Sequence, residues 1–331
     1  MSPVFICGYQ KSGTTLLAAL LDNHPDLMVF PEETSFFRWV NIKDFKQISD
    51  RLDFQLQETH VNRLQIDKAN DGMEGNRDYS DFPFDSFQSQ VREVFNQGPK
   101  SHKDILLALM KAFAAVSNQQ NKRYWIEKTP RNEVYFTSIK KMFPDARYIY
   151  IVRDPRDVFC SYRKNRERYT AGRATLKLGN FISTWTTSLR SGLSMEGDQI
   201  LYLRYEDLVS NLQDQLEIVT KFLDVPLVEG LTIPSKLGIQ WQGNSMHGDH
   251  FKAVDDRAVG RWRHSQWTKE IAVIEKILGT TMKALGYDVQ SREKLPGSRD
   301  SFQLITGDRK KSLANIAWLR INGLKIRSTF N

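Results

Sequence analysis

The sequence predicts an α/β fold, with a mostly parallel central sheet that helices cover on both faces. Short apolar runs, typical of buried strands, alternate along the chain with longer segments of helical periodicity. The clearest strand pattern is residues 147–152, which are rich in β-branched and aromatic side chains. Asp154 and Pro155 follow at once and favour a helix start, so a strand leads directly into a helix there.

The other elements are expected in the same alternating order. A strand beginning near residue 4 leads through a turn into a helix over 13–22, which Asn23-His24-Pro25 ends. Further strands are expected at 27–30, 124–126, 147–152 and 200–204, and further helices up to Phe143 and over 155–168, 180–195 and 206–222. We predict a main domain over 1–290, a largely helical insertion at 41–121, and a basic C-terminal extension over 291–331 that contains an amphipathic helix.

An anion-binding turn is predicted between the first strand and the first helix. Gly8 and Gly13 allow the turn to tighten, so that backbone N–H groups and the positive end of the helix converge on an anion. Gly8, Gly13 and Thr15 fit the P-loop spacing, but Thr14 replaces the lysine that reaches the β- and γ-phosphates of a nucleoside triphosphate. The nearest cation is Lys11, inside the turn. The turn therefore predicts a phosphorylated ligand, and Thr14 counts against an ATP-dependent small-molecule kinase, which remains the alternative in this fold class.

A second phosphate site is predicted after the strand at 147–152. Arg153 ends this strand, and Ser161 lies two helical turns further on. An arginine fork and a serine hydroxyl placed in this way can converge on one phosphate group.

These two motifs resemble those of sulfotransferases that use 3′-phosphoadenosine-5′-phosphosulfate (PAPS). Residues 10–16 resemble the 5′-phosphosulfate loop of that family, and Arg153 with Ser161 resembles its 3′-phosphate element, including the eight-residue separation. The resemblance implies the sulfotransferase version of the P-loop-containing nucleoside triphosphate hydrolase-like fold, with PAPS as donor, PAP as product and no metal. In the loop it implies these cofactor-binding residues: Gln10, Lys11, Ser12, Gly13, Thr14 and Thr15.

The resemblance also implies two cationic catalytic residues. Sulfuryl transfer depends mainly on positioning and on stabilising charge at the leaving oxygen. Lys11 is expected to stabilise that oxygen, and Lys128 matches a second positive position in the protein-tyrosine sulfotransferase branch.

Glu33 is the candidate base that accepts the acceptor proton, because the pair Glu32-Glu33 resembles a glutamate pair in the same branch. Glu32 is an alternative base. Ser35 stands where that branch has arginine, so a saccharide or another small hydroxylated metabolite is favoured as acceptor over protein tyrosine. The usual cytosolic members employ a histidine base, and four histidines compete with Glu33 on that ground: His60, His102, His247 and His250.

Later segments are expected to complete the nucleotide pocket by the same resemblance. Tyr205 would contact the adenosine, and Ser245 the 5′-side phosphosulfate. Arg261 or Arg263 would bind the 3′-phosphate, with Trp262 near the base. A non-catalytic module that binds a nucleotide or a sulfated glycan is the alternative from another functional class.

Composition favours an anionic small-molecule ligand in a reducing compartment. The net charge is +8, but no zinc-knuckle spacing, recognition-helix signature or stacking motif supports nucleic acid. Cys7 and Cys160 both lie in apolar elements and are expected to be buried thiols. The first strand starts by residue 4, and no apolar run approaches the length of a membrane span, so a cytoplasmic enzyme is expected, as a monomer or a homodimer.

The C-terminal tail has an amphipathic pattern over residues 313–326 with basic flanks. Such a helix can lie on an anionic membrane surface or dock on its own domain or a second subunit. Docking is the expectation that we favour.

Overall fold

The computed structural model describes residues 1–44, 46–48, 50–51, 82–99, 101–169, 177–241, 243, 253–289 and 309–330. Its centre is a five-stranded sheet in the order β2-β3-β1-β4-β5, in which every neighbouring pair is parallel. This confirms the predicted sheet. Its strands are β1 (Ser2–Gly8), β2 (Leu27–Val29), β3 (Tyr124–Lys128), β4 (Arg147–Val152) and β5 (Ile200–Arg204).

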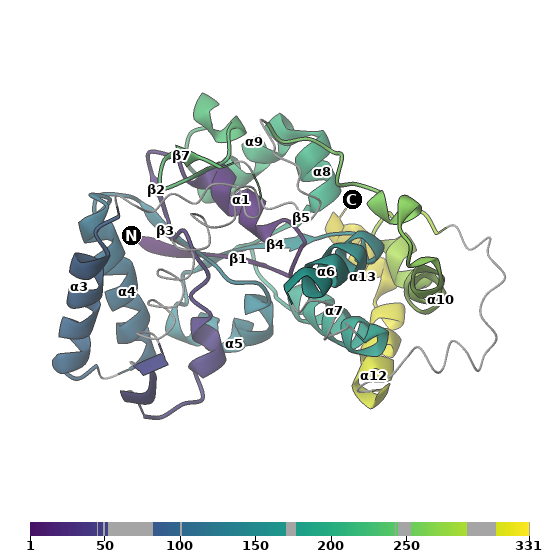
Figure 1. Ribbon diagram of the computed structural model, residues 1–331, viewed down its shortest axis with the longest axis horizontal. Coiled ribbons are helices and arrows are strands. Elements are labelled where there is room, and N and C mark those ends of the chain that lie inside the picture. Colours follow the sequence, from purple (N-terminus) through teal and green to yellow (C-terminus); the bar gives the residue numbers. More distant parts are fainter. Residues whose placement is uncertain are drawn as a thin grey trace.

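Helices cover both faces of the sheet, because successive side chains of each strand point to opposite sides. In β1, Val4 and Ile6 belong to one apolar core, and Phe5 and Cys7 belong to the other. The first face carries α1 (Thr14–Leu21), α8 (Tyr205–Ser210) and α9 (Leu212–Leu223). The second carries α5 (Phe136–Met142), α6 (Pro155–Tyr169) and α7 (Leu178–Leu193), and Figure 1 shows the two sets above and below the sheet.

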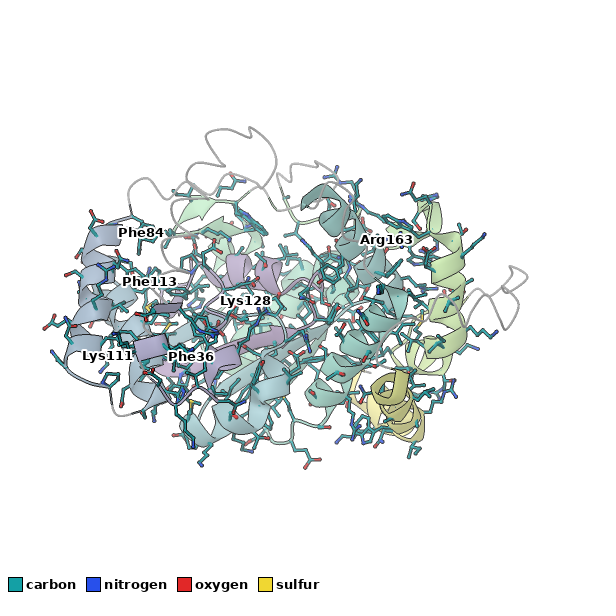
Figure 2. All side chains as sticks on the ribbon, turned by 60° about the horizontal axis from the view of Figure 1, so that its bottom comes forward. Phe36, Phe84, Lys111, Phe113, Lys128 and Arg163 are labelled. Carbon is teal, nitrogen blue, oxygen red and sulfur yellow. The ribbon has the colours of Figure 1, made fainter. Side chains whose placement is uncertain are left out.

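The described part of residues 41–121 contains two long helices. They are α3 (Phe84–Asn96) and α4 (His102–Val116), which pack against each other beside the sheet. The Phe113 ring of α4 lies 5.2 Å from Phe30 after β2, and Phe82 stacks on Phe113 at 5.8 Å. Figure 2 shows Phe84 and Phe113 on this side of the molecule. These helices therefore belong to the main core rather than to a separate unit.

Two details of the elements differ from the sequence prediction. The helix expected over 206–222 is broken at Asn211, whose φ of −131° is not helical, so α8 and α9 are separate. A short antiparallel hairpin of β6 (Ser235–Lys236) and β7 (Ile239–Gln240) was not expected from the sequence. The remaining elements are η1 (Phe36–Trp39), η2 (Asn132–Tyr135), η3 (Glu229–Thr232), η4 (Arg261–His264) and α10 (Thr268–Ala284).

The C-terminal helices dock on their own domain. Helix α12 (Arg309–Ile321) packs against α7 and α10, and α13 (Gly323–Phe330) packs against α10 and β5. Ile316, Leu319 and Ile326 are buried in this contact. Their burial uses the apolar face that a membrane surface would require.

No helix among the described residues combines the length and the apolar character needed to cross a membrane.

We predict that Gly192→Ala destabilises the fold. A Cβ atom at Gly192 of α7 would lie 2.4 Å from the Tyr150 ring of β4, so either the helix or the ring must move. Overpacking of this kind lowers the free energy of unfolding by about 1–3 kcal/mol, measurable by urea titration.

Gly230→Ala is the matched control, because nothing lies within 4 Å of the Cβ position at Gly230. We expect its free energy of unfolding to stay within about 0.5 kcal/mol of that of the wild type. Equal effects of the two substitutions would contradict the proposed packing of α7 on β4.

Candidate functional site

A cavity of about 360 Å³ lies at the carboxyl edge of the sheet. A residue that follows each of the five strands contributes to its lining, because parallel strands all end at the same edge. These residues are Lys11 after β1, Glu33 after β2, Pro130 after β3, Arg153 after β4 and Tyr205 after β5.

The turn between β1 and α1 has the backbone of an anion-binding loop. Lys11 and Gly13 have left-handed φ values of 66° and 97°, and the Ser12 N–H donates to the Tyr9 carbonyl at 3.2 Å. A Cβ at Gly13 would lie 2.5 Å from the Tyr205 ring, so only glycine fits there. The Ser12 side chain is 1% exposed, and its Oγ has no hydrogen-bond partner among the described residues. A buried hydroxyl without a partner is costly, and a ligand oxygen bound in the loop would satisfy it.

The base of the loop is held by a buried carboxylate that the sequence did not reveal. Glu133 accepts a hydrogen bond from the Gly8 N–H at 2.9 Å and another from the Ser188 hydroxyl. The Arg131 N–H donates to the Gly8 carbonyl at 2.8 Å. Burial raises the pKa of Glu133. The chain after β3 therefore fixes the position at which the loop leaves β1.

The structure brings Glu33 and Lys128 together. Lys128 Nζ lies 3.0 Å from Glu33 Oε1, and the lysine side chain is 4% exposed whereas the glutamate is 39% exposed. Figure 2 shows Lys128 near the middle of the molecule. Glu32 points to a different partner, because its Oε1 lies 3.5 Å from Lys236 Nζ. Of the two adjacent carboxylates, Glu33 is the one that lines the cavity.

A second buried carboxylate sets the relative position of Glu33 and Lys128. Glu127 accepts hydrogen bonds from the Thr34 hydroxyl at 2.7 Å, the Thr129 hydroxyl at 2.5 Å and Asn132 Nδ2 at 2.5 Å. Its pKa is raised by burial. Since Thr34 adjoins Glu33 and Glu127 adjoins Lys128, this network joins the turn after β2 to the end of β3.

Arg153 and Ser161 line the same cavity. Arg153 Nη1 donates to the Lys11 carbonyl at 2.9 Å, and Nη2 donates to the Ala258 carbonyl at 2.6 Å. Its guanidinium lies 4.1 Å from the centre of the Tyr205 ring. The Arg153 Nε is buried and has no hydrogen-bond partner among the described residues. Arg153 therefore adjoins the β1–α1 loop, and Ser161 lines the same cavity.

Trp262, expected near the nucleotide base, lies outside the described lining of the cavity. Arg261 lines the cavity, but Trp262 and Arg263 are not among the described residues that do so. The Trp262 ring is buried and lies 3.8 Å from the guanidinium of Arg156, with Arg263 at 4.7 Å. Arg156 is itself almost fully buried, and the electron-rich face of an indole is a favourable neighbour for it.

Of the four competing histidines, His102 is the one that the structure describes, and it lies away from the cavity. His102 begins α4, where its Nε2 lies 2.9 Å from the Ile42 carbonyl oxygen, and it does not belong to the described cavity lining. Ser245, His60, His247 and His250 lie outside the described residues. Within the described part of the chain, no cluster of three or more His, Cys, Asp or Glu side chains forms a metal site.

Sequence reasoning missed many residues of the cavity wall, and four with aromatic or charged side chains illustrate why. Arg38 follows Glu33 on η1, Trp241 follows the β6–β7 hairpin, and Asp157 and Tyr162 lie on α6 with Ser161. The spacing of Asp157 from Arg153 and Ser161, one helical turn on each side, was a signal that it shares their face. No comparable signal marks Trp241, because the hairpin itself was not predicted.

A profile of the sulfotransferase family matches residues 3–229, which is more than half of the chain. The chain belongs to this family. Protein-tyrosine sulfotransferase 1 of Danio rerio is 23% identical over 316 residues, a match that covers 92% of this chain and 77% of that protein. The nodulation protein NoeE of Sinorhizobium fredii is 21% identical over 90% of this chain and 68% of its own length. A matched relative from Caenorhabditis elegans, protein-tyrosine sulfotransferase A, is covered over 50% of its length.

Solved structures agree with the family assignment at the level of the fold. The sulfotransferase domain from the curacin biosynthetic pathway matches with a TM-score of 0.58 at 19% identity, over 87% of this chain and 99% of that domain. The sulfotransferase domain of the Synechococcus PCC 7002 olefin synthase matches with a TM-score of 0.53 at 20% identity, over 92% and 93% of the two chains. This family member therefore has the P-loop-like sulfotransferase fold that the sequence resemblance implies.

We predict that neither thiol of the native protein reacts with a thiol reagent such as DTNB at pH 8. The structure confirms that Cys7 and Cys160 are free and buried. Burial raises the pKa of Cys160 to about 12 and the pKa of Cys7 well above its ordinary value. The reactive thiolate is therefore scarce at pH 8. Both thiols should react once urea unfolds the chain, and rapid labelling of Cys160 without urea would contradict its burial.

Proposed function

We propose that this protein transfers the sulfuryl group of PAPS to a hydroxyl group of a small acceptor, with Glu33 as the base. The observation that carries the proposal is one cavity lined by the β1–α1 loop, by Arg153 and Ser161, and by Glu33. Anion-binding groups and a carboxylate thus share a single space of the size usual for small-molecule sites.

The residues in and beside the cavity fit a nucleotide with two phosphorylated groups. In the β1–α1 loop, which lies at the start of α1, the Ser12 hydroxyl is a buried donor without a partner among the described residues. Next to the loop, Arg153 Nε is likewise buried without a described partner, and Ser161 adds a hydroxyl to the cavity lining. Bound PAPS would supply the activated sulfuryl group. In this assignment Gln10, Lys11, Ser12, Gly13, Thr14 and Thr15 hold the phosphosulfate end, and Arg153, Ser161 and Arg261 hold the 3′-phosphate.

Glu33 is suited to accept the proton of the acceptor hydroxyl. Its carboxylate lines the cavity, and its ion pair with Lys128 holds one of its oxygens in a fixed position. The proton leaves the hydroxyl for the Glu33 carboxylate as the hydroxyl oxygen bonds to sulfur. The bond from sulfur to the nucleotide oxygen breaks in the same step, and Lys11, which lines the cavity from within the loop, would stabilise the negative charge that develops on that oxygen.

The acceptor that we propose is a saccharide or another small hydroxylated metabolite. Ser35 replaces the arginine of the protein-tyrosine branch, and its backbone N–H donates to Thr129 Oγ1 at 3.1 Å. Position 35 therefore supports the turn that carries Glu33 and brings no cation to an acidic peptide.

The first test is calorimetric titration with PAP and, separately, with ATP and Mg²⁺. We expect PAP to bind with a Kd in the micromolar range or below and ATP with Mg²⁺ to bind at least about tenfold more weakly, because Thr14 replaces the P-loop lysine. Preference for ATP with Mg²⁺ would instead support the kinase. Binding of PAP without turnover of PAPS over a panel of saccharides, small alcohols and tyrosine peptides would support a non-catalytic module.

We predict that Glu33→Gln lowers the rate of transfer by at least about 100-fold while the Kd for PAP stays within about twofold of the wild-type value. Loss of a general base typically costs about 10²–10⁴-fold in rate. The rate is measured as PAP release from PAPS with the acceptor that the panel identifies.

Glu32→Gln is the matched comparison, because Glu32 pairs with Lys236 and lies next to Glu33 in the chain. We expect this variant to keep at least about a third of the wild-type rate, because Glu32 is not part of the described cavity lining and a rate loss this small corresponds to less than about 1 kcal/mol. The reverse result, with Glu32 essential and Glu33 dispensable, would transfer the role of base to Glu32.

A further inference from the structure

One wall of the cavity comes from a distant part of the chain. Residues 253–264, which we call the wall segment, contribute Ala253, Val254, Asp255, Ala258 and Arg261 to the lining. This segment is attached to the junction between β4 and α6. Three residues of that junction make the attachment: Arg153, Arg156 and Asp157.

Asp157 holds the backbone on both sides of Arg261. Its Oδ2 accepts a hydrogen bond from the Gly260 N–H at 2.7 Å, and its Oδ1 accepts one from the Trp262 N–H at 2.9 Å. Asp157 is 2% exposed, so these bonds lie out of competition with bulk water. Arg261 lies between Gly260 and Trp262 in the chain, and of these three described residues it is the one that lines the cavity.

The other contacts fix the same turn. Gly260 has a left-handed φ of 73°, and Arg261 Nε donates to the Arg257 carbonyl at 2.7 Å. The Trp262 ring lies over Arg156, which is bonded to Asp154 at 2.6 Å and also to Glu275. The turn at 260–262 is therefore attached to α6 by two backbone hydrogen bonds to Asp157 and by the contact of the Trp262 ring with Arg156.

A carboxylate in the wall of an anion site needs an explanation, because it repels phosphate. Both carboxylate oxygens of Asp157 accept hydrogen bonds from backbone N–H groups. Burial raises the pKa of Asp157, whereas the nearby positive charge of Arg153 favours the charged form of this carboxylate. Its geometry suits it to hold protein backbone and not to contact the ligand.

We propose that Asp157 is a positioning residue for nucleotide binding, which holds the wall segment so that Arg261 faces the phosphates. This inference rests on the proposed function, since it takes the nucleotide to be the ligand of the cavity. It assigns to the second aspartate of Arg153-Asp154-Pro155-Arg156-Asp157 a role separate from direct phosphate contact.

A double-mutant cycle on the Kd for PAP tests this coupling. We expect Asp157→Asn and Arg261→Ala each to raise the Kd about 10- to 100-fold, the range for losing hydrogen bonds to a charged group. The Asn side chain places an NH2 donor against one of the two backbone N–H donors, so one of the two hydrogen bonds to the turn is lost. In the Arg261→Ala background, Asp157→Asn should raise the Kd by no more than about twofold, because its effect acts through Arg261.

Independent effects in the cycle would overturn the proposal, because a merely structural role of Asp157 would weaken binding with or without Arg261. Asp224→Asn is the control, since Asp224 forms an exposed ion pair with Arg123 away from the cavity, and its Kd should equal that of the wild type. If Asp157→Asn does not fold, Asp157→Glu replaces it, because the longer side chain keeps the charge and displaces the carboxylate.

Limited trypsin digestion of the ligand-free protein provides a second readout. Asp157→Asn should accelerate cleavage after Arg261 and Arg263, relative to the rest of the chain, by about tenfold or more, because release of the turn exposes these bonds. Unchanged cleavage would overturn the positioning role. If the wild type does not bind PAP, the proposed function fails, whereas the digestion still decides whether Asp157 holds the wall segment.

Discussion

All five strands of the sheet run parallel, so all five end at the same edge, and the cavity depends on this constraint. Each strand is followed by a turn that adds a side chain to the lining. Residues as distant in the chain as Lys11 and Tyr205 thereby line one cavity. The central position of β1 places the β1–α1 loop between the end of β3, where Lys128 lies, and the turn that begins with Arg153.

Buried carboxylates connect these turns to one another. Glu127 joins the turn after β2 to that after β3, Glu133 joins the turn after β3 to the loop after β1, and Glu206 accepts the Asp154 N–H at 2.9 Å after β4. Burial raises the pKa of each of them. A buried carboxylate is tolerated only when donors satisfy its oxygens. The same hydrogen bonds that make their burial tolerable therefore also fix the distances between the turns.

Two buried guanidinium groups stabilise the β4–α6 junction. Arg153 lies against Tyr205 and Arg156 lies against Trp262, in each case over the face of the ring. Aromatic residues that the sequence suggested as nucleotide contacts thus stabilise arginines of the β4–α6 junction. Trp262 packs against Arg156 and is therefore buried in the core, although the preceding residue, Arg261, lines the cavity.

The sequence by itself determined the fold class and the family, because strand–turn–helix motifs are local. The glycine spacing at Gly8 and Gly13, and the apolar run before Arg153, depend on neighbouring residues only. Tertiary structure alone decided which of Glu32 and Glu33 faces the cavity, since their partners Lys236 and Lys128 lie far along the chain. It also decided the place of Trp262 and the docking of α12 and α13, because both depend on surfaces assembled from distant segments. Local patterns fix how the backbone turns, whereas the direction of a side chain depends on what the rest of the chain packs around it.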